Sequence, residues 1–290
     1  MPSLIDLRRR IRSVKNTQQI TKAMKMVSAA KLRRAQDRVI AARPYATTMR
    51  EMLANLIAAA QSDPDASTSP WLTRRELKRA DLVFITSDKG LAGAFNSNLI
   101  KAAQRFLAEH TGREVTLTLI GRKGRDYYRR RNAKILSEHI HILNRPAFDD
   151  AAEVAREIIR RYRDGETDAV FLINNDFKSV MVQKLSVQQL LPLEQEQTEK
   201  KEQQTDYIYE QPPLAMLDRL MPRYVEVAVF RGMLETVAAE HAARMTAMDK
   251  ASSNAKEVID TLTLNMNRIR QAAITKEIIE VVSGAAAAAE

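Results

Sequence analysis

The chain has 290 residues, of which 45 % are hydrophobic and only 5 % are aromatic. Because large cores depend on aromatic side chains for buried area, this composition indicates that much of the chain packs along helix seams. The absence of cysteine excludes disulfides, thiolate nucleophiles and cysteine metal sites. No run of about 18 apolar residues occurs, so we expect no membrane-spanning segment.

The net charge of +10 is concentrated near the N-terminus. Residues 1–50 carry 13 Lys and Arg against two Asp, so the rest of the chain sums to −1. A basic first helix implies an acidic partner, which could be nucleic acid, anionic lipid or acidic protein; a solvated basic face is the alternative. The opening residues 1–13 carry charges where a signal peptide needs an apolar run, which favours a reducing compartment.

The first expected element is a long helix, because nothing interrupts the chain from Ser3 to Arg43. Ser3 followed by Asp6 is typical of a helix start. Apolar or small residues then recur in alternating steps of three and four, which predicts a heptad seam. Its members are Leu4, Leu7, Ile11, Val14, Thr21, Ser28, Leu32, Ala35 and Val39, with Gln18 and Lys25 in phase. Polar residues thin the middle of this seam, beside Met24 and Val27.

The middle of the chain is predicted to be an α/β domain. Apart from Pro2, every proline lies between Pro44 and Pro222, and six of the eight glycines lie in residues 90–165. Short apolar runs predict strands at 81–86, 115–121 and 168–174, and helices are expected at 96–109, 124–130 and 148–163. This alternation favours a mostly parallel, Rossmann-like sheet. Polar stretches at 62–70 and 194–206 read as exposed linkers.

The middle domain carries only weak signals for chemistry. Gly121-Arg122-Lys123-Gly124 and Gly90-Leu91-Ala92-Gly93 each follow a strand, but neither completes a phosphate-binding motif, so strand-to-helix turns are favoured. His139 and His141 alternate along an expected strand without a matching carboxylate cluster. We therefore expect no catalytic site, no cofactor and no metal, and a scaffold role for the domain.

The last element is a second, longer helix, expected from Arg223 to Ser283. Its seam repeats the same alternation through Leu234, Ala238, His241, Met245, Met248, Ser252, Ala255, Ile259, Leu262, Met266, Ile269 and Ala273. Two such stripes at opposite ends of one chain most simply bury each other as an antiparallel coiled coil; coiled coils between chains are the alternative. The expected plan is an N-terminal coiled-coil helix at 1–60, a central α/β domain at 75–210 and a C-terminal coiled-coil helix at 213–290.

The second helix should outreach the first, at on the order of 90 Å against 60 Å. Beyond the seam its apolar residues point around most of the helix: Ala272, Ala273, Ile274, Ile278, Ile279, Val281 and Val282. A helix that is apolar on most sides requires burial all round. We therefore expect this tip to sit in a socket formed by other chains.

Four segments together resemble a known family. They are LRRRIRSVKNTQQITKAMKMVSAAKLRRAQ at 7–36, SDKGLAGAFN at 87–96, AARMTAMDKASSNA at 242–255 and RQAAITKEIIEVVSGA at 270–285. In this order and spacing they are similar to the γ chain of F-type ATP synthase. The region from about 122 to 165 contributes little to the resemblance. The chain departs from the chloroplast members in having no cysteine pair, so thiol control of that kind is excluded.

The resemblance implies a non-catalytic rotor. In the family the paired helices form a central stalk that turns inside a hexamer of α and β chains, while its foot rests on the membrane c-ring and binds the ε chain. It implies that Arg270, Gln271, Thr275 and Met24 contact the β chain, and that Tyr207 and Glu210 contact the c-ring. The implied location is the cytoplasmic face of a bacterial plasma membrane, as a peripheral protein without nucleic acid.

The sequence leaves two other hypotheses for the function open. A basic coiled-coil protein that binds nucleic acid fits the pI of about 9.8 and the arginine-rich first helix. The apolar tip and the lack of aromatic residues among the basic ones oppose it. A nucleotide-dependent α/β enzyme is the third reading, and it lacks a phosphate motif.

Overall fold

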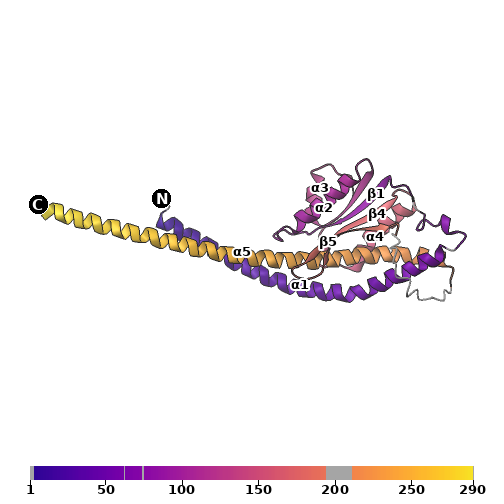
Figure 1. The fold of residues 1–290 in the computed structure, drawn as a ribbon, viewed down its shortest axis with the longest axis horizontal. Coiled ribbons are helices and arrows are strands. Elements are labelled where there is room, and N and C mark those ends of the chain that lie inside the picture. The colour runs from indigo at the N-terminus through magenta and orange to yellow at the C-terminus, as the bar shows by residue number, and fades with distance from the viewer. Residues whose placement is uncertain (1–2, 62, 74, 194–210, 290) are drawn as a thin grey trace. The chain divides into compact units, whose positions relative to one another are not determined.

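The computed structural model describes residues 3–61, 63–73, 75–193 and 211–289. Its two longest helices, α1 (Leu4–Ala60) and α5 (Pro213–Ala289), stand at the two ends of the sequence (Figure 1). The chain divides into two compact units, Met1–Ser28 with Arg244–Glu290 and Ala29–Ala243. We call these the terminal unit and the domain unit. Within each, α1 packs against α5, which confirms the expected fold class of paired terminal helices with a central α/β domain.

Both long helices continue through a proline. Residues 3–43 and 223–283 are free of proline, and within the helices expected at 1–60 and 213–290, α1 includes Pro44 and α5 includes Pro222. A proline removes one helical hydrogen bond and crowds the carbonyl four residues earlier. Pro44 is exposed, and Ile40, four residues before it, is 53 % exposed. The carbonyl that loses its partner therefore lies on the solvent side, where water can replace the missing donor.

The domain unit contains a five-stranded sheet of order β3-β2-β1-β4-β5. Its strands are β1 (Arg79–Ile85), β2 (Glu114–Ile120), β3 (Ile135–His139), β4 (Ala169–Phe177) and β5 (Gln183–Leu191). The first four in this order pair in parallel, and β5 pairs antiparallel to β4. The mostly parallel sheet was expected, but β5 was missed because its sequence, QKLSVQQLL, alternates only weakly between polar and apolar residues.

Helices cover both faces of this sheet. On one face lie α2 (Phe95–Glu109) and α3 (Arg122–Arg129), with the ring of Phe106 4.8 Å from that of Phe171. On the other face lie α4 (Phe148–Arg163) and the 213–243 part of α5, where the rings of Phe148 and Phe230 lie 5.6 Å apart. Since neighbouring residues of a strand point to opposite faces, the central strands are buried on both sides.

Within the domain unit, α5 is the middle layer between α1 and the sheet (Figure 1). Residues 232–240 are all buried. At Gly232 a Cβ atom would lie 3.1 Å from Leu172 and 3.2 Å from Ile85, so the absence of a side chain permits the close approach of helix and sheet. On the opposite side α1 contributes a buried stripe of Leu32, Ala35, Val39, Ala46, Met49, Leu53, Leu56 and Ala60. The heptad seam expected for residues 32–39 is thus confirmed and continues to Ala60.

Candidate partner-binding surface

In the terminal unit the predicted seam is the line along which the two helices pack. Leu7, Thr21 and Ser28 of α1 are buried, and Ile11, Val14, Gln18 and Lys25 are half-buried. On α5, Met248, Ser252 and Ala255 are buried, and Ile259, Leu262, Met266, Ile269 and Ala273 are half-buried. The alternation of three and four keeps these residues on one side of each helix. Most of the other described positions of this helix pair are exposed.

Side-chain contacts define the register of this pairing. Thr21 Oγ1 lies 2.6 Å from Ser252 Oγ, and Gln18 Nε2 donates to the Ser252 carbonyl at 3.3 Å. Lys25 Nζ lies 2.6 Å from Asp249 Oδ1. Moving forward along α1 therefore means moving backward along α5, so the helices are antiparallel. Both helices rise about 1.5 Å per residue, so this register places Leu4 opposite about residue 268. Since α1 begins at Leu4, the part of α5 beyond about residue 268 is not paired with α1.

The unpaired end of α5 is exposed and apolar. Ile278 is 57 % exposed and Val281 72 %, and Ile274, Ile279 and Val282 are similarly exposed. Large aliphatic side chains grouped on several sides of one helix usually mark an interaction site. We call residues 270–283 the apolar tip. Its predicted burial in a socket of other chains concerns an assembly and stays a prediction.

The outer face of α1 in the terminal unit is basic. Arg8, Arg9, Arg10, Arg12, Lys15 and Lys22 are all exposed. Asp6 and Ser3 pair at the start of the helix. Ser3 Oγ donates a hydrogen bond to the Asp6 carboxylate at 2.9 Å and accepts one from the backbone N–H of Asp6 at 3.1 Å. The positive face therefore has few acidic neighbours on its own helix, and it suits an acidic partner surface.

The residues expected to contact the β chain fall in two places. Arg270, Gln271 and Thr275 are exposed within the apolar tip, where Thr275 Oγ1 donates to the Gln271 carbonyl at 2.9 Å. Met24 is half-buried beside the polar part of the seam. By the register above it lies level with about residue 248, on the order of 30 Å along the helix from Arg270. The expected c-ring contacts Tyr207 and Glu210 lie outside the described residues.

The backbone amides of the glycine turn before α3 already donate to neighbouring acceptors in the domain unit. At the start of α3 the amides of Arg122, Lys123 and Gly124 donate to Asp88 Oδ1, the Ser87 carbonyl and Thr86 Oγ1 at 2.9, 3.0 and 2.8 Å. A Cβ at Gly121 would lie 2.2 Å from the Thr86 carbonyl oxygen. These amides are therefore occupied, and the glycine serves a close approach of two backbones rather than a phosphate.

The histidines of the domain unit are also engaged locally. His139 Nε2 lies 3.3 Å from Ser137 Oγ, and His141 Nε2 lies 3.5 Å from Arg122 Nη2. His110 stacks on Phe106 with ring centroids 4.1 Å apart. In the part of the chain that the structure describes, no group of three or more His, Asp or Glu is placed to hold a metal ion.

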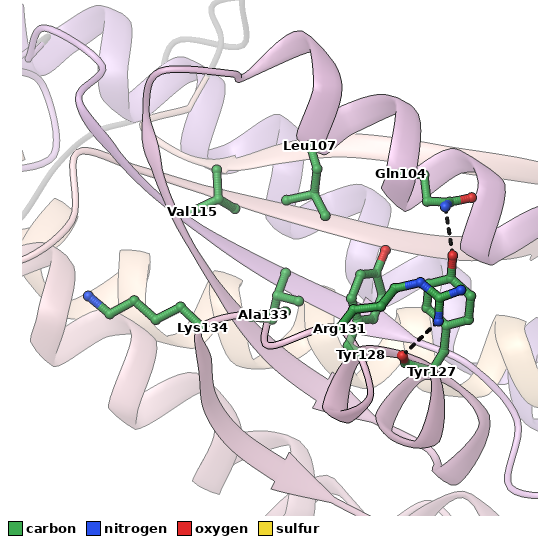
Figure 2. Close-up of a pocket in the computed structure, with 9 residues that line it drawn as sticks. Gln104, Leu107, Val115, Tyr127, Tyr128, Arg131, Ala133 and Lys134 are labelled. Atoms are coloured by element: carbon green, nitrogen blue, oxygen red, sulfur yellow. Dashed lines mark hydrogen bonds between the residues drawn. The ribbon is translucent and has the colours of Figure 1, made fainter.

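A shallow cavity of about 410 Å³ lies between α2, α3 and β2 (Figure 2). Gln104 Nε2 donates to the Tyr127 hydroxyl at 2.6 Å, and the Arg131 guanidinium lies 3.6 Å from the Tyr127 ring centroid. Lys134 pairs with Glu114. Burial raises the pKa of the neighbouring Tyr128 phenol. Both basic groups of the cavity are thus already engaged by neighbours, which makes it a poor site for an anionic ligand.

Sequence reasoning missed the acidic residues inside the domain unit. Asp81, Asp168 and Glu235 are 1 %, 7 % and 5 % exposed. Asp81 accepts from Arg161 Nε at 2.8 Å and Nη2 at 3.1 Å. The sequence indicated them only by position, since Asp81 and Asp168 begin apolar runs and Glu235 lies within one, and a buried carboxylate must find a partner. The partners are distant in sequence, so the pattern alone could not identify them.

Comparison with known proteins places the chain in a family. A family model described as ATP synthase matches residues 3–288. The chain is similar to the ATP synthase gamma chain of Solibacter usitatus, with 61 % identity over 288 residues, which is 99 % of this chain and 100 % of that one. It is 50 % identical over 286 residues to the gamma chain of Geobacter sp. strain M21, with 98 % of each covered.

Solved structures agree. A chain in the central stalk and c-ring of the Tetrahymena thermophila mitochondrial ATP synthase aligns with a TM-score of 0.63 and 26 % identity, over 80 % of this chain and 99 % of that one. A chain of the Euglena gracilis mitochondrial ATP synthase aligns with a TM-score of 0.70 over 98 % of this chain and 94 % of that one. At 20 % identity the second match supports the fold alone.

The paired helices, the apolar tip and the near-complete match to these relatives agree with one another. No helix in the described part of the chain has the length and hydropathy needed to cross a bilayer. The chain therefore belongs to the ATP synthase gamma chain family, the non-catalytic central-stalk subunits of F1Fo ATP synthase.

Proposed function

We propose that this chain turns as a shaft and transmits torque between a membrane ring of c subunits and a hexamer of α and β chains, so that proton flow is coupled to ATP synthesis or hydrolysis. The observation that carries the proposal is the apolar tip. Burying one large aliphatic side chain stabilises a complex by about 1.5–3 kcal/mol. Five such side chains on a single unpaired helix end therefore favour a socket that encloses the helix from several sides.

The polar residues of the tip suit the β chain as partner. Arg270 and Gln271 are exposed donors, and Thr275 lies one helical turn beyond Gln271. Met24 would contact the β chain lower on the shaft, and Tyr207 and Glu210 would contact the c-ring. The ε chain would bind at the foot, beside the α/β domain. These assignments rest on the family resemblance, and the plan of domains at 1–60, 75–210 and 213–290 remains part of the same proposal.

The basic face of α1 suits contacts that form and break repeatedly. A rotating shaft meets three similar β chains in succession and must not bind one orientation too tightly. Exposed charge pairs contribute only about 0–1 kcal/mol each and are screened by salt. Arginine and lysine facing acidic loops would therefore guide the shaft without trapping it. The location we propose is the cytoplasmic face of a bacterial plasma membrane, where the chain is held by its partners.

Charge reversal on this face tests the proposal. In membrane vesicles carrying the whole complex, Arg8→Glu with Arg12→Glu should markedly lower the rate of ATP-driven proton pumping. The melting temperature of the isolated chain should change little. The matched control is Arg156→Glu with Arg163→Glu, two exposed arginines of α4. That control should leave pumping closer to wild type. Normal pumping by the α1 variant in a fully assembled complex would refute the proposed role of the basic face.

A further inference from the structure

One junction in the domain unit joins both long helices to the sheet. Glu235 of α5 has only 5 % of its surface exposed, and its Oε2 accepts the backbone N–H of Phe177, the last residue of β4, at 2.8 Å. Arg43 of α1 donates from Nη2 to the Phe177 carbonyl at 2.7 Å and to Glu235 Oε1 at 3.2 Å. We call Arg43, Phe177 and Glu235 the junction. Its three members come from α1, β4 and α5.

The junction is directional, whereas the packing around it is not. Burial of apolar side chains opposes separation of the helix from the sheet, but it depends little on orientation. Hydrogen bonds weaken steeply when their angle or distance changes, and those to a charged group are stronger than neutral ones. Sliding or rolling of α5 over β4 would break the bonds of Glu235 while preserving much of the apolar contact.

Neighbouring contacts restrict the same movement. One residue after Glu235, Thr236 Oγ1 accepts a hydrogen bond from the backbone N–H of Asn175 at 3.4 Å. One helical turn before it, Gly232 lies against Leu172 and Ile85 so closely that a Cβ would be 3.1 and 3.2 Å from them. Arg231 Nη2 reaches Gln188 of β5 at 3.4 Å. The side chain of Glu235 is the buried, charged member of this set, and it also pairs with Arg43 of α1.

We propose that the junction locks the rotational register of the paired helices against the α/β domain, so that torque passes between them without slip, and that Glu235 is its positioning residue. This inference rests on the proposed function, because it supposes that torque crosses this contact. Glu235 touches no substrate and acts through the backbone of β4. A purely structural role would change stability without changing coupling.

The test uses the whole complex in membrane vesicles and measures ATP hydrolysis and ATP-driven proton pumping together. In Glu235→Gln an amide replaces the carboxylate at nearly the same size, so the charge that holds Arg43 is lost. We expect hydrolysis to continue while protons pumped per ATP hydrolysed fall below wild type. In the isolated chain we expect faster hydrogen exchange at the Phe177 amide, since its acceptor is weakened.

Glu226→Gln is the matched control. Glu226 lies on the same helix and pairs with an arginine, but its partner Arg223 is on α5 itself, at 2.9 Å. It should retain wild-type pumping per ATP. If the complex with Glu235→Gln fails to assemble, pumping per ATP is measured in Arg43→Met instead. The Arg43 side chain is 44 % exposed, so its replacement leaves the core filled. Arg43→Lys should fall between Arg43→Met and wild type, since lysine keeps the charge and loses the forked geometry.

The outcomes separate the two proposals. Wild-type pumping per ATP in Glu235→Gln, or in Arg43→Met where that variant decides, would overturn the junction as a torque lock, even if the melting temperature falls. A wild-type complex that hydrolyses ATP without pumping would instead contradict the proposed function itself. Reduced coupling in the junction variants with a normal Glu226→Gln control would support the lock.

Discussion

The same pair of helices is held together differently in the two units. In the domain unit α5 is buried on nearly every side, with the sheet and α4 against it, and charged groups such as Glu235 are paired in the interior. In the described part of the terminal unit the two helices pack against each other alone, and the middle of their seam is made of small polar side chains, Thr21, Ser28 and Ser252. The heptad pattern is nearly identical in both.

The difference shows that a heptad seam specifies which sides of two helices pack together, but not how stable the resulting helix pair is. Large apolar side chains and a third packed layer provide stability in the domain unit. A seam of Thr and Ser buries little apolar area, and its buried hydroxyls mainly specify register. The same heptad pattern therefore gives a different stability in each unit.

The largest expected contrast comes from removing one leucine from each unit. Leu53→Ala empties a site on α1 that is 1 % exposed in the domain unit, and it should cost about 4 kcal/mol in free energy of unfolding. Leu7→Ala, at a site 3 % exposed in the two-helix seam, should cost about 2 kcal/mol because the neighbouring helix can relax toward the gap. Urea unfolding followed by circular dichroism measures both. Equal costs would mean that the terminal unit is packed as firmly as the domain unit.

Acid should weaken the domain unit through Asp168, whose side chain is only 7 % exposed. Burial tends to raise the pKa of Asp168, but the amides of Arg79 at 2.8 Å and Lys78 at 3.1 Å donate to it and lower the pKa below its ordinary 3.8. The folded pKa is thus below the unfolded one. The stabilisation is complete above the ordinary value and is lost as pH falls through the folded one.

Asp168→Asn tests this at two pH values. At neutral pH it should lower the free energy of unfolding by about 2 kcal/mol, since hydrogen bonds to a charged group are lost. At about pH 2.5 the difference from wild type should shrink, because the wild-type carboxylate is then increasingly protonated. Urea unfolding at both values gives the comparison. A difference that stays constant with pH would show that the charge of Asp168 is not what matters.

The smallest effect is expected in the polar part of the terminal seam. Thr21→Val leaves Ser252 Oγ with its other contact, the Met248 carbonyl at 2.9 Å, so the single change should cost about 1 kcal/mol. Combining it with Ser252→Ala replaces both partners by apolar groups and should recover part of that cost. A double-mutant cycle on the isolated chain measures the coupling. A coupling near zero would mean that the 2.6 Å contact does not specify the register.

Much of the architecture was predictable because it depends on local periodicity. The seam from Leu7 to Ala273 follows from residues three and four apart, and β1, β2 and β4 follow from short apolar runs. The strand β5 was not predicted, and the local pattern did not explain how the helices expected at 1–60 and 213–290 accommodate Pro44 and Pro222. Their stability comes from a neighbouring strand and from packing partners, which a local pattern does not contain.

The candidate surface divides in the same way. The apolar tip and the basic face of α1 could be located from residue order, since both are properties of single helices. Met24 and Arg270 were expected to serve one partner, but the antiparallel register separates them along the helix pair. The junction of Arg43, Phe177 and Glu235 could not be foreseen, because its members are separated by 58 residues or more.

By itself the sequence determined two amphipathic helices, their matching stripes and an alternating α/β segment, since each is a repeat along one stretch of chain. The tertiary structure decided which stretch of the helix pair is enclosed and which is slender, and where each buried carboxylate finds its partner. The physical reason is that burial and charge pairing depend on what lies opposite a residue in space, and the residues opposite are far away along the chain.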